Sequence, residues 1–226
     1  MRLQIRRLVS ALGFTVMAAL ASTSTPVSAA SNNIWSGPVT PLGPDSDASA
    51  VELGVRFRSD ISGFITGIRF YKFAGNTGTH IGNLWSNTGA LLARATFTTE
   101  TASGWQVVTF ATPVAIAANT VYVASYHTDV GRYAANASYF ISGFDNPPLH
   151  ALADGVGGAN GVYRYSTTTA FPTDTWNATN YWVDVVFSTT APPVADTTPP
   201  SFNPLHPRFS PPRSVRAPSS RQRSAR

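Results

Sequence analysis

Short runs of β-branched and aromatic residues, separated by Gly, Asn, Asp and Pro, recur at nearly regular intervals between residues 31 and 190. Residues 51–57 alternate strictly between large apolar residues and residues that are charged or glycine, which predicts a β-strand with one buried face. Further strands are predicted at 63–72, 79–85, 91–98, 105–110, 120–128, 162–165 and 181–188. The inward-facing residues predicted from this alternation include Phe57, Ile68, Phe70 and Val123.

Evenly spaced strands without intervening helices are typical of β-sandwiches and β-barrels. The chain of 226 residues has no cysteine, so neither a disulfide framework nor a thiolate metal site is available to it. A domain of about 160 residues buries enough apolar surface to fold without such cross-links. We therefore predict an all-β domain over residues 31–190, built as a jelly-roll-like antiparallel β-sandwich.

The first thirty residues have the three-part organisation of a secretory signal peptide. A basic MRLQIRR precedes an apolar stretch at residues 8–21, and the small and polar STSTPVSAA follows. The apolar stretch has fourteen residues, which is short of the roughly 20 needed to cross a bilayer. The sequence thus predicts a signal peptide over residues 1–30, a secreted or cell-surface product, and no transmembrane segment.

The composition changes sharply at Ala191. Residues 191–226 hold nine of the seventeen prolines and six arginines, with no glycine and few large apolar residues. Such a segment cannot bury enough apolar surface to offset its ordering entropy, so we predict a disordered linker or tail. Two explanations stay open for its basic remainder: a truncated or frame-shifted remnant, or a tail that contacts an anionic cell surface.

The net charge of +5 does not describe the predicted domain. Nine of the sixteen basic residues lie in the first seven or the last thirty-six residues, whereas residues 31–190 carry seven basic and ten acidic residues. A basic surface for nucleic acid is therefore not expected on the domain.

Six segments stand in a fixed order along the domain: VELGVRFRSDISGFITGIRFYK, GNTGTHIGNLWSNTGALLA, SGWQVVTFATPV, YVASYHT, NGVYRY and NYWVDVVF. Together they resemble domain of unknown function 4082, and the resemblance covers almost all of residues 34–187. It implies a bacterial extracellular β-sandwich module that occurs in tandem, or beside immunoglobulin-like and fibronectin-like modules, in surface proteins. It implies no activity, ligand or catalytic residue.

No catalytic residues are assigned from the sequence. The Gly-x-Ser-x-Gly motif of serine hydrolases does not occur, and GVGGANG lacks the lysine and the following helix of a phosphate-binding loop. His127 and Asp129 are two residues apart at the end of a predicted strand, where a solvated pair is expected. We therefore predict a protein that is not an enzyme.

Two acidic residues fall inside predicted strands, where a charge needs a partner. Glu52 shares the polar face of its strand with Arg56, which predicts an ion pair. Asp184 is expected to pair with Arg56 or with Arg69.

Calcium is the one cofactor for which the sequence offers candidate ligands. No pair of histidines has the spacing of a transition-metal site. Asp45, Asp47 and Glu52 gather near the N-terminal edge of the domain, and carboxylates are the ligands that calcium prefers. The favoured alternative is that Asp45-Ser46-Asp47 forms a turn.

Residues 126–182 combine aromatic rings with polar side chains in long loops. Aromatic faces flanked by amides and carboxylates stack on sugar rings and hydrogen-bond their hydroxyls. Aromatic residues within predicted strands, such as Tyr163, Tyr165 and Trp182, are expected more often in the core than at a ligand. The candidate ligand-binding residues, chosen because they lie next to turns, are His127, Asp129, Tyr133, Asp145, Asn146, His150 and Trp176.

The sequence favours a secreted, non-catalytic β-sandwich module that binds a polysaccharide or another cell-surface polymer. The alternative is a structural spacer or adhesion module whose loops contact neighbouring modules of a surface protein. Exposed aromatic side chains gathered on one face would favour binding, since a spacer should cover them. A paired, desolvated acid and base in a deep pocket would instead indicate an enzyme.

Overall fold

The computed structural model describes residues 31–39 and 41–191, so the predicted signal peptide and tail lie outside the described residues. The strands are β1 (Ser31–Asn32), β2 (Val51–Ser59), β3 (Gly63–Lys72), β4 (His80–Ser86), β5 (Leu91–Thr96), β6 (Gly104–Ile116), β7 (Tyr122–Thr128), β8 (Phe144–Asn146), β9 (Leu149–Ala151), β10 (Val162–Tyr165), β11 (Asp174–Thr175) and β12 (Val183–Ser188). A 3₁₀ turn, η1 (Tyr139–Ile141), lies between β7 and β8. Within the described residues, no helix has the length and apolar character needed to span a membrane.

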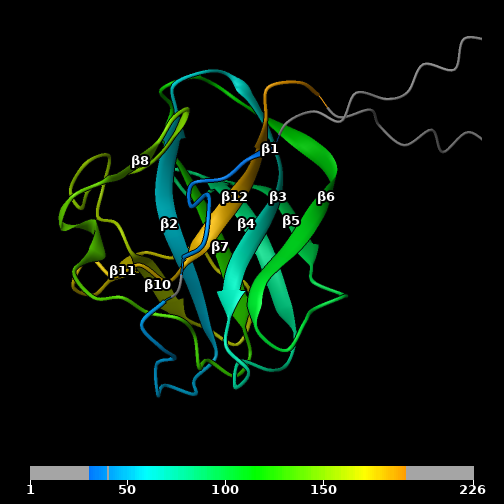
Figure 1. Ribbon diagram of the computed structural model, residues 1–226, viewed down its shortest axis with the longest axis vertical. Helices are drawn as coiled ribbons and strands as arrows, with labels where there is room; N and C mark the ends of the chain where they lie inside the picture. Colours follow the sequence, from blue (N-terminus) through cyan, green and yellow to red (C-terminus); the bar gives the residue numbers. More distant parts are fainter. Residues whose placement is uncertain (1–30, 40, 192–226) are drawn as a thin grey trace, which may run out of the picture. The chain divides into compact units, whose positions relative to one another are not determined.

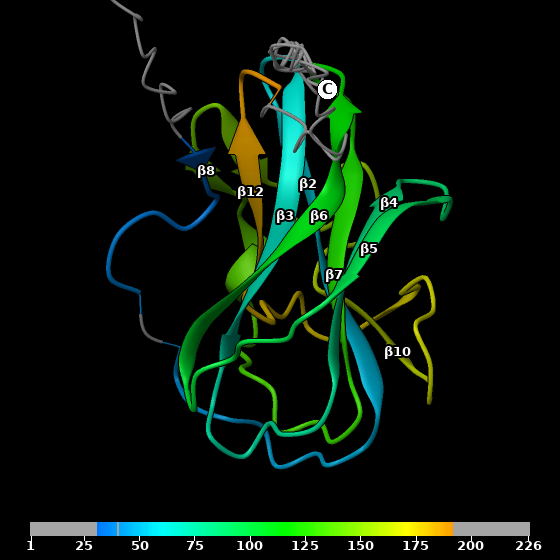
Figure 2. The ribbon, with the colours of Figure 1, turned by 90° about the vertical axis from the view of Figure 1, so that its right-hand side faces the viewer.

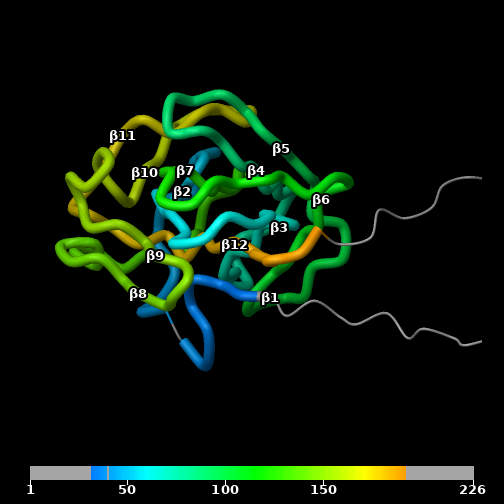
Figure 3. Tube along the Cα trace, turned by 90° about the horizontal axis from the view of Figure 1, so that it is seen from above, coloured from blue at the N-terminus to red at the C-terminus, as the bar shows by residue number. Residues whose placement is uncertain are grey.

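The strands form two antiparallel sheets that pack as a sandwich (Figures 1 and 2). The smaller sheet has the order β1-β12-β3-β6. The larger sheet has the order β11-β10-β2-β7-β4-β5, and the β8–β9 hairpin joins it through β2. The two layers lie alongside each other when the molecule is seen from above (Figure 3). The predicted all-β sandwich is confirmed.

Aromatic side chains dominate the core between the sheets. Phe70 of β3 stacks on Tyr126 of β7 with ring centroids 4.0 Å apart, and it meets Phe97 edge-on at 4.9 Å. Phe57 and Ile68 are buried in the same cluster, as the alternation of β2 and β3 predicts. Because large aromatic rings remove much apolar surface from water, these contacts are a main source of the hydrophobic stabilisation.

A second apolar cluster covers the outer face of the larger sheet, which the sequence did not predict. Val123 lies opposite Arg56 in the register of β7 and β2, so it shares the face that points away from the main core. It packs there with Trp85 and Val162, against which Phe171 lies. The expectation that Val123 points into the main core is wrong, because both faces of this sheet are covered.

Asp184 and Arg69 face each other across β12 and β3 and form the ion pair expected for Asp184, with a nitrogen–oxygen distance of 2.6 Å. The carboxylate of Asp184 also accepts hydrogen bonds from the backbone N–H groups of Ile34, at 2.7 Å, and Trp35, at 3.2 Å. These contacts compensate a fully buried charge and hold the segment that follows β1 against the smaller sheet.

The strands that the sequence did not predict are short. β1, β8, β9 and β11 have two or three residues each, too few to show an alternation. β6 runs six residues beyond its predicted end, from 110 to Ile116, and passes through Pro113. It lies at the edge of the smaller sheet, where a residue without an N–H group is tolerated.

Candidate functional site

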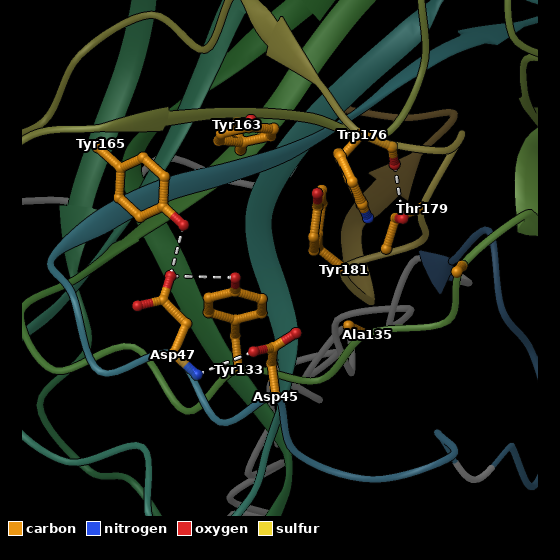
Figure 4. Close-up of a pocket in the computed structure, with 10 residues that line it drawn as sticks. Asp45, Asp47, Tyr133, Ala135, Tyr163, Tyr165, Trp176, Thr179 and Tyr181 are labelled. Atoms are coloured by element: carbon orange, nitrogen blue, oxygen red, sulfur yellow. Dashed lines mark hydrogen bonds between the residues drawn. The ribbon is translucent and has the colours of Figure 1, made fainter.

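A pocket of about 440 Å³ lies beside β10, where four segments that are distant in the sequence meet (Figure 4). These segments are the loop between β1 and β2, the loop after β7, strand β10, and the loop between β11 and β12. The lining residues are Asp45, Asp47, Tyr133, Ala135, Ala137, Tyr163, Tyr165, Trp176, Thr179 and Tyr181. A volume of this size accommodates a small ligand or one unit of a polymer.

Four tyrosines, which we call the tyrosine cluster, contact one another in a row along the pocket. Tyr165 meets Tyr163 edge-on with ring centroids 5.6 Å apart. Tyr163 meets Tyr181 at 6.3 Å, and Tyr181 meets Tyr133 at 5.7 Å. Asp47 links the two ends of the row. Its Oδ2 accepts hydrogen bonds from the hydroxyls of Tyr165, at 2.5 Å, and Tyr133, at 3.3 Å (Figure 4). Each side chain is therefore held in place by its neighbours before a ligand arrives.

Strand β10 places two of these tyrosines on one face. Tyr163 lies opposite Leu53 of β2, and Tyr165 lies opposite Val51, whose side chains are buried in the main core. Arg164 stands between the two tyrosines and therefore points to the other face. The alternation of this short strand thus brings two phenol rings, and no cation, to the pocket.

Two Asx turns fix the carboxylates of the pocket. Asp45 Oδ1 accepts the N–H of Asp47 at 2.8 Å, and Asp47 Oδ1 accepts the N–H of Ser49 at 2.9 Å, which confirms the predicted turn. The N–H of Asp45 donates to the carbonyl of Tyr133 at 2.8 Å and ties this loop to the segment after β7. Gly131 permits the close approach, since a Cβ there would lie 2.5 Å from the carbonyl oxygen of Asp47.

Trp176 stands beside the pocket on a tight turn. Asn177 and Ala178 both have positive φ angles, 47° and 46°, and the N–H of Thr179 donates to the carbonyl of Trp176 at 3.1 Å. This is the pattern of a type I′ turn. Trp176 is 62% exposed and Tyr165 is 53% exposed. Two large aromatic side chains at one pocket are therefore accessible to a ligand.

The pocket contains an ionised carboxylate among neutral phenols. Burial raises the pKa of Asp47, but hydrogen bonds from two tyrosine hydroxyls and a backbone N–H outweigh it and leave the pKa below its ordinary value. The hydrogen bond to Asp47 raises the pKa of Tyr165. Burial raises the pKa of Tyr133 and Tyr181. At neutral pH these three phenols therefore keep their protons and remain hydrogen-bond donors.

Two of the predicted ligand-binding residues, Tyr133 and Trp176, line the pocket. Asp45 and Asp47, which the sequence offered as calcium ligands, line it as well. Glu52, the third calcium candidate, is buried in β2 and is not among the lining residues. In the part of the chain that the structure describes, no three His, Asp or Glu side chains form a group that could hold a metal ion.

His127 and Asp129 are neighbours, as their spacing predicts, but they lie outside the pocket. The Nε2 of His127 is 3.3 Å from Asp129 Oδ1. The expectation of a solvated pair is wrong for His127, because its side chain is buried in β7. This burial lowers its pKa, so the imidazole is neutral at pH 7. Asp129 is exposed and accepts the N–H of Thr79 at 3.3 Å.

Asp145, Asn146 and His150 belong to the β8–β9 hairpin and also lie outside the pocket. The Nδ1 of His150 is 2.6 Å from Asp145 Oδ1, and its Nε2 is 2.7 Å from Asp60 Oδ2. Asn146 donates to the carbonyl of Asn33 at 2.9 Å. These contacts connect the hairpin to the end of β2 and to the segment after β1, which indicates a role in holding the fold together.

The predicted ion pair between Glu52 and Arg56 is wrong. Glu52 Oε1 accepts hydrogen bonds from Asn83, at 2.8 Å, and Ser125, at 2.5 Å. Arg56 donates instead to the carbonyl of Ala159 at 2.7 Å. Burial raises the pKa of Glu52 to about 8, so the carboxyl is protonated at neutral pH. The prediction failed because the outer face of β2 is covered, which disfavours a charge there.

Four further residues that line the pocket are absent from the ligand-binding residues predicted from the sequence: Tyr163, Tyr165, Thr179 and Tyr181. The motif NGVYRY does place Tyr163 and Tyr165 on one face, and that signal was available. The sequence predicts core positions for these rings more readily than ligand contacts, because it does not reveal which segments lie beside β10. In the structure only the two-residue β11 lies beyond β10, so this face of the strand is left open to the pocket.

The fold and the pocket together define an antiparallel β-sandwich module with an aromatic, acidic cavity formed by its loops. Residues 38–183, more than half of the chain, match the family model of domain of unknown function DUF4082, and the chain belongs to this family. The resemblance of the six segments is thereby confirmed. A search of curated proteins found no match.

Proposed function

We propose that this DUF4082 domain is a non-catalytic module that binds carbohydrate, in a protein that is secreted or displayed at the cell surface. The observation that carries the proposal is the pocket, in which the tyrosine cluster and the exposed Trp176 stand beside two carboxylates. A spacer would be expected to cover such side chains, whereas a binding module needs them accessible.

The pocket offers complementary groups for both parts of a sugar. Sugar rings have C–H faces that pack on aromatic rings and hydroxyls that hydrogen-bond at their edges. Trp176 and Tyr165 supply accessible aromatic surface, and Asp45 supplies a carboxylate acceptor. Because the tyrosine cluster is already fixed by its own contacts, little side-chain entropy is lost on binding.

The chemistry of the pocket favours binding over hydrolysis. A glycosidase needs a carboxylic acid whose pKa is raised, so that it can protonate the leaving oxygen. The hydrogen bonds on Asp47 act in the opposite direction and lower its pKa. The domain is therefore expected to release no reducing sugar from a polysaccharide that it binds.

The proposed location depends on the N-terminal sequence, since residues 1–30 have the pattern of a secretory signal peptide. A pocket that holds one unit of a polymer buries little of the ligand's surface, so one domain should bind weakly. Display of several copies on one surface would compensate, because the second contact benefits from a high effective concentration.

A glycan array probed with the full chain tests the proposal. The wild type should retain at least one polysaccharide, and Trp176→Ala should weaken that binding by about 1–2 kcal/mol, or roughly five- to thirty-fold. Ile141→Ala is the matched control, because Ile141 is 75% exposed and lies outside the pocket.

Thermal melts of both variants must accompany the array. Equal melting temperatures would assign the loss of binding to the missing indole. If the wild type retained no glycan, or if Trp176→Ala lost binding only because it unfolded, the spacer or adhesion function would replace this proposal.

A further inference from the structure

The charged groups of the pocket are all of one sign. Asp45 and Asp47 line it, and its ten lining residues include no lysine, arginine or histidine. Among the described residues, neither carboxylate lies within ion-pair distance of a basic side chain, although eight such contacts occur elsewhere. Six of the other eight described carboxylates have such a contact, and Asp154 and Asp174 have none, so what distinguishes the pocket is that two such carboxylates lie together beside aromatic rings.

The nearest basic residues in the sequence point elsewhere. Arg164 lies between two pocket tyrosines, but the alternation of β10 turns it to the opposite face, where it donates to Thr173 Oγ1 at 3.1 Å. Arg132 is exposed and does not line the pocket. The pocket therefore keeps its negative charge.

The hydrogen bonding of the two carboxylates leaves room for a ligand. Asp47 Oδ2 is occupied by two tyrosine hydroxyls, which stabilise its negative charge. Asp45 Oδ1 accepts a backbone N–H, whereas within the described residues no donor reaches its Oδ2. Asp45 thus offers an acceptor to a ligand, and Asp47 contributes charge at short range.

Aromatic faces add to the attraction for positive charge. The π-surface of a tyrosine or tryptophan carries a negative potential, and cations bind over it within about 6 Å of the ring centre. Five aromatic side chains line this pocket together with the two carboxylates. Phosphates, sulfates and uronic acids would be repelled by the same arrangement.

We infer that the saccharide bound here carries a cationic amine, as in a hexosamine with a free ammonium group, and this inference rests on the proposed carbohydrate binding. The ammonium group lies near Asp45 and Asp47, where it donates to Asp45 and faces the phenol and indole rings. The apolar face of the sugar packs on Trp176.

Two oligosaccharides with the same backbone test the inference by calorimetry on the full chain. One is a hexamer of glucosamine, and the other is the corresponding hexamer of N-acetylglucosamine, which lacks the charge. At about pH 5.5 the glucosamine hexamer should bind at least about tenfold more tightly. The preference should shrink as salt is raised, since the screening length falls from about 10 Å at 0.1 M to about 3 Å at 1 M.

Replacing each pocket carboxylate by an amide tests whether its negative charge attracts the ligand. Asp45→Asn and Asp47→Asn retain the ability to form Asx turns, so the loop should keep its conformation. Each should lower the affinity for glucosamine roughly five- to thirty-fold and leave that for N-acetylglucosamine within about twofold. Asp174→Asn removes the same charge from exposed β11, outside the pocket, and should change neither affinity.

Three results would overturn the inference. The first is equal or tighter binding of N-acetylglucosamine, the second is a loss in Asp174→Asn as large as in the pocket variants, and the third is no binding of glucosamine. The proposed function survives all three if Trp176→Ala weakens the binding of a neutral glycan roughly five- to thirty-fold while the variant stays folded. It fails if the wild type retains no glycan, charged or neutral, or if Trp176→Ala loses binding only because it unfolds.

Discussion

The hydroxyl of Tyr165 donates a hydrogen bond of 2.5 Å to Oδ2 of Asp47, a residue 118 positions earlier in the chain. This contact joins strand β10 to the loop that precedes β2, and it is the strongest single influence that lowers the pKa of Asp47. One hydrogen bond therefore both positions the side chain of Tyr165 and stabilises the negative charge of Asp47.

Tyr165→Phe should raise the pKa of Asp47 toward its ordinary value, because the variant keeps the ring and loses the donor. Stability should change by less than about 0.5 kcal/mol, since the side chain is half exposed. Carboxyl carbon shifts followed by NMR against pH would measure the pKa. Tyr163→Phe is the control, because in the described part of the chain its hydroxyl makes no hydrogen bond to Asp47. An unchanged pKa in Tyr165→Phe would contradict the prediction.

Glu52 should make the wild type less stable as the pH rises. Its pKa is 4.5 in an unfolded chain and about 8 in the fold, so the folded state binds one more proton between these values. The stabilising effect is fully present below pH 4.5 and declines up to about pH 8, by roughly 3–5 kcal/mol.

Glu52→Gln should remove this decline, because the amide cannot lose a proton in this range. Urea denaturation of both proteins at several pH values gives the difference in unfolding free energy. Asp174→Asn, an exposed acid-to-amide change, should leave the pH profile unaltered. Parallel profiles for wild type and Glu52→Gln would show that Glu52 is ionised in the fold.

Phe70→Ala should lower stability by about 3–5 kcal/mol, because it removes the ring that stacks on Tyr126 and leaves a cavity between the sheets. Val107→Ala in the neighbouring strand should cost less than about 0.5 kcal/mol, since Val107 is 55% exposed. Thermal or urea unfolding measures both. A similar cost for the two variants would mean that the inward face of β3 is assigned wrongly.

Arg69→Met should lower stability by about 3–5 kcal/mol at neutral pH, because Asp184 is left buried without its counter-ion. Combining it with Asp184→Asn should recover part of this loss, since the amide can still accept the N–H of Ile34. A double-mutant cycle from urea unfolding isolates the coupling. Strict additivity of the two changes would contradict an interaction between them.

The strands and the inner core could be predicted because their signals are local. The alternation that marks β2 and β3 depends only on residues 51–72. The need to compensate a buried charge predicted a basic partner for Asp184 and left two candidates, of which Arg69 is the one that pairs. The surroundings of Glu52 and Val123 were predicted wrongly, because they depend on residues distant in the sequence. Their surroundings are set by residues 162–171, which are more than thirty positions from either and fold back over the outer face.

Only the part of the candidate site that has local sequence signals could be predicted. Tyr133 and Trp176 were selected because turns flank them, and turn residues are visible in the sequence. Tyr163 and Tyr165 carry a strand pattern, and only the topology of the larger sheet reveals that one face of their strand is left open. The alternation of a strand shows which residues share a face, but it does not show which other segments cover that face.

The pairing of β1 with β12 has a geometric consequence. Ser31 pairs with Ser188, which pairs in turn with Phe64 at the start of β3, whereas Tyr165 pairs with Val51 at the far end of β2 (Figure 1). The nine residues of β2 span about 27 Å, so the chain enters and leaves the sandwich at one pole while the pocket occupies the other. A segment that joins the domain at Ser31 or Ser188 is therefore attached at the end of the sandwich opposite the pocket, so the attachment itself does not cover the pocket.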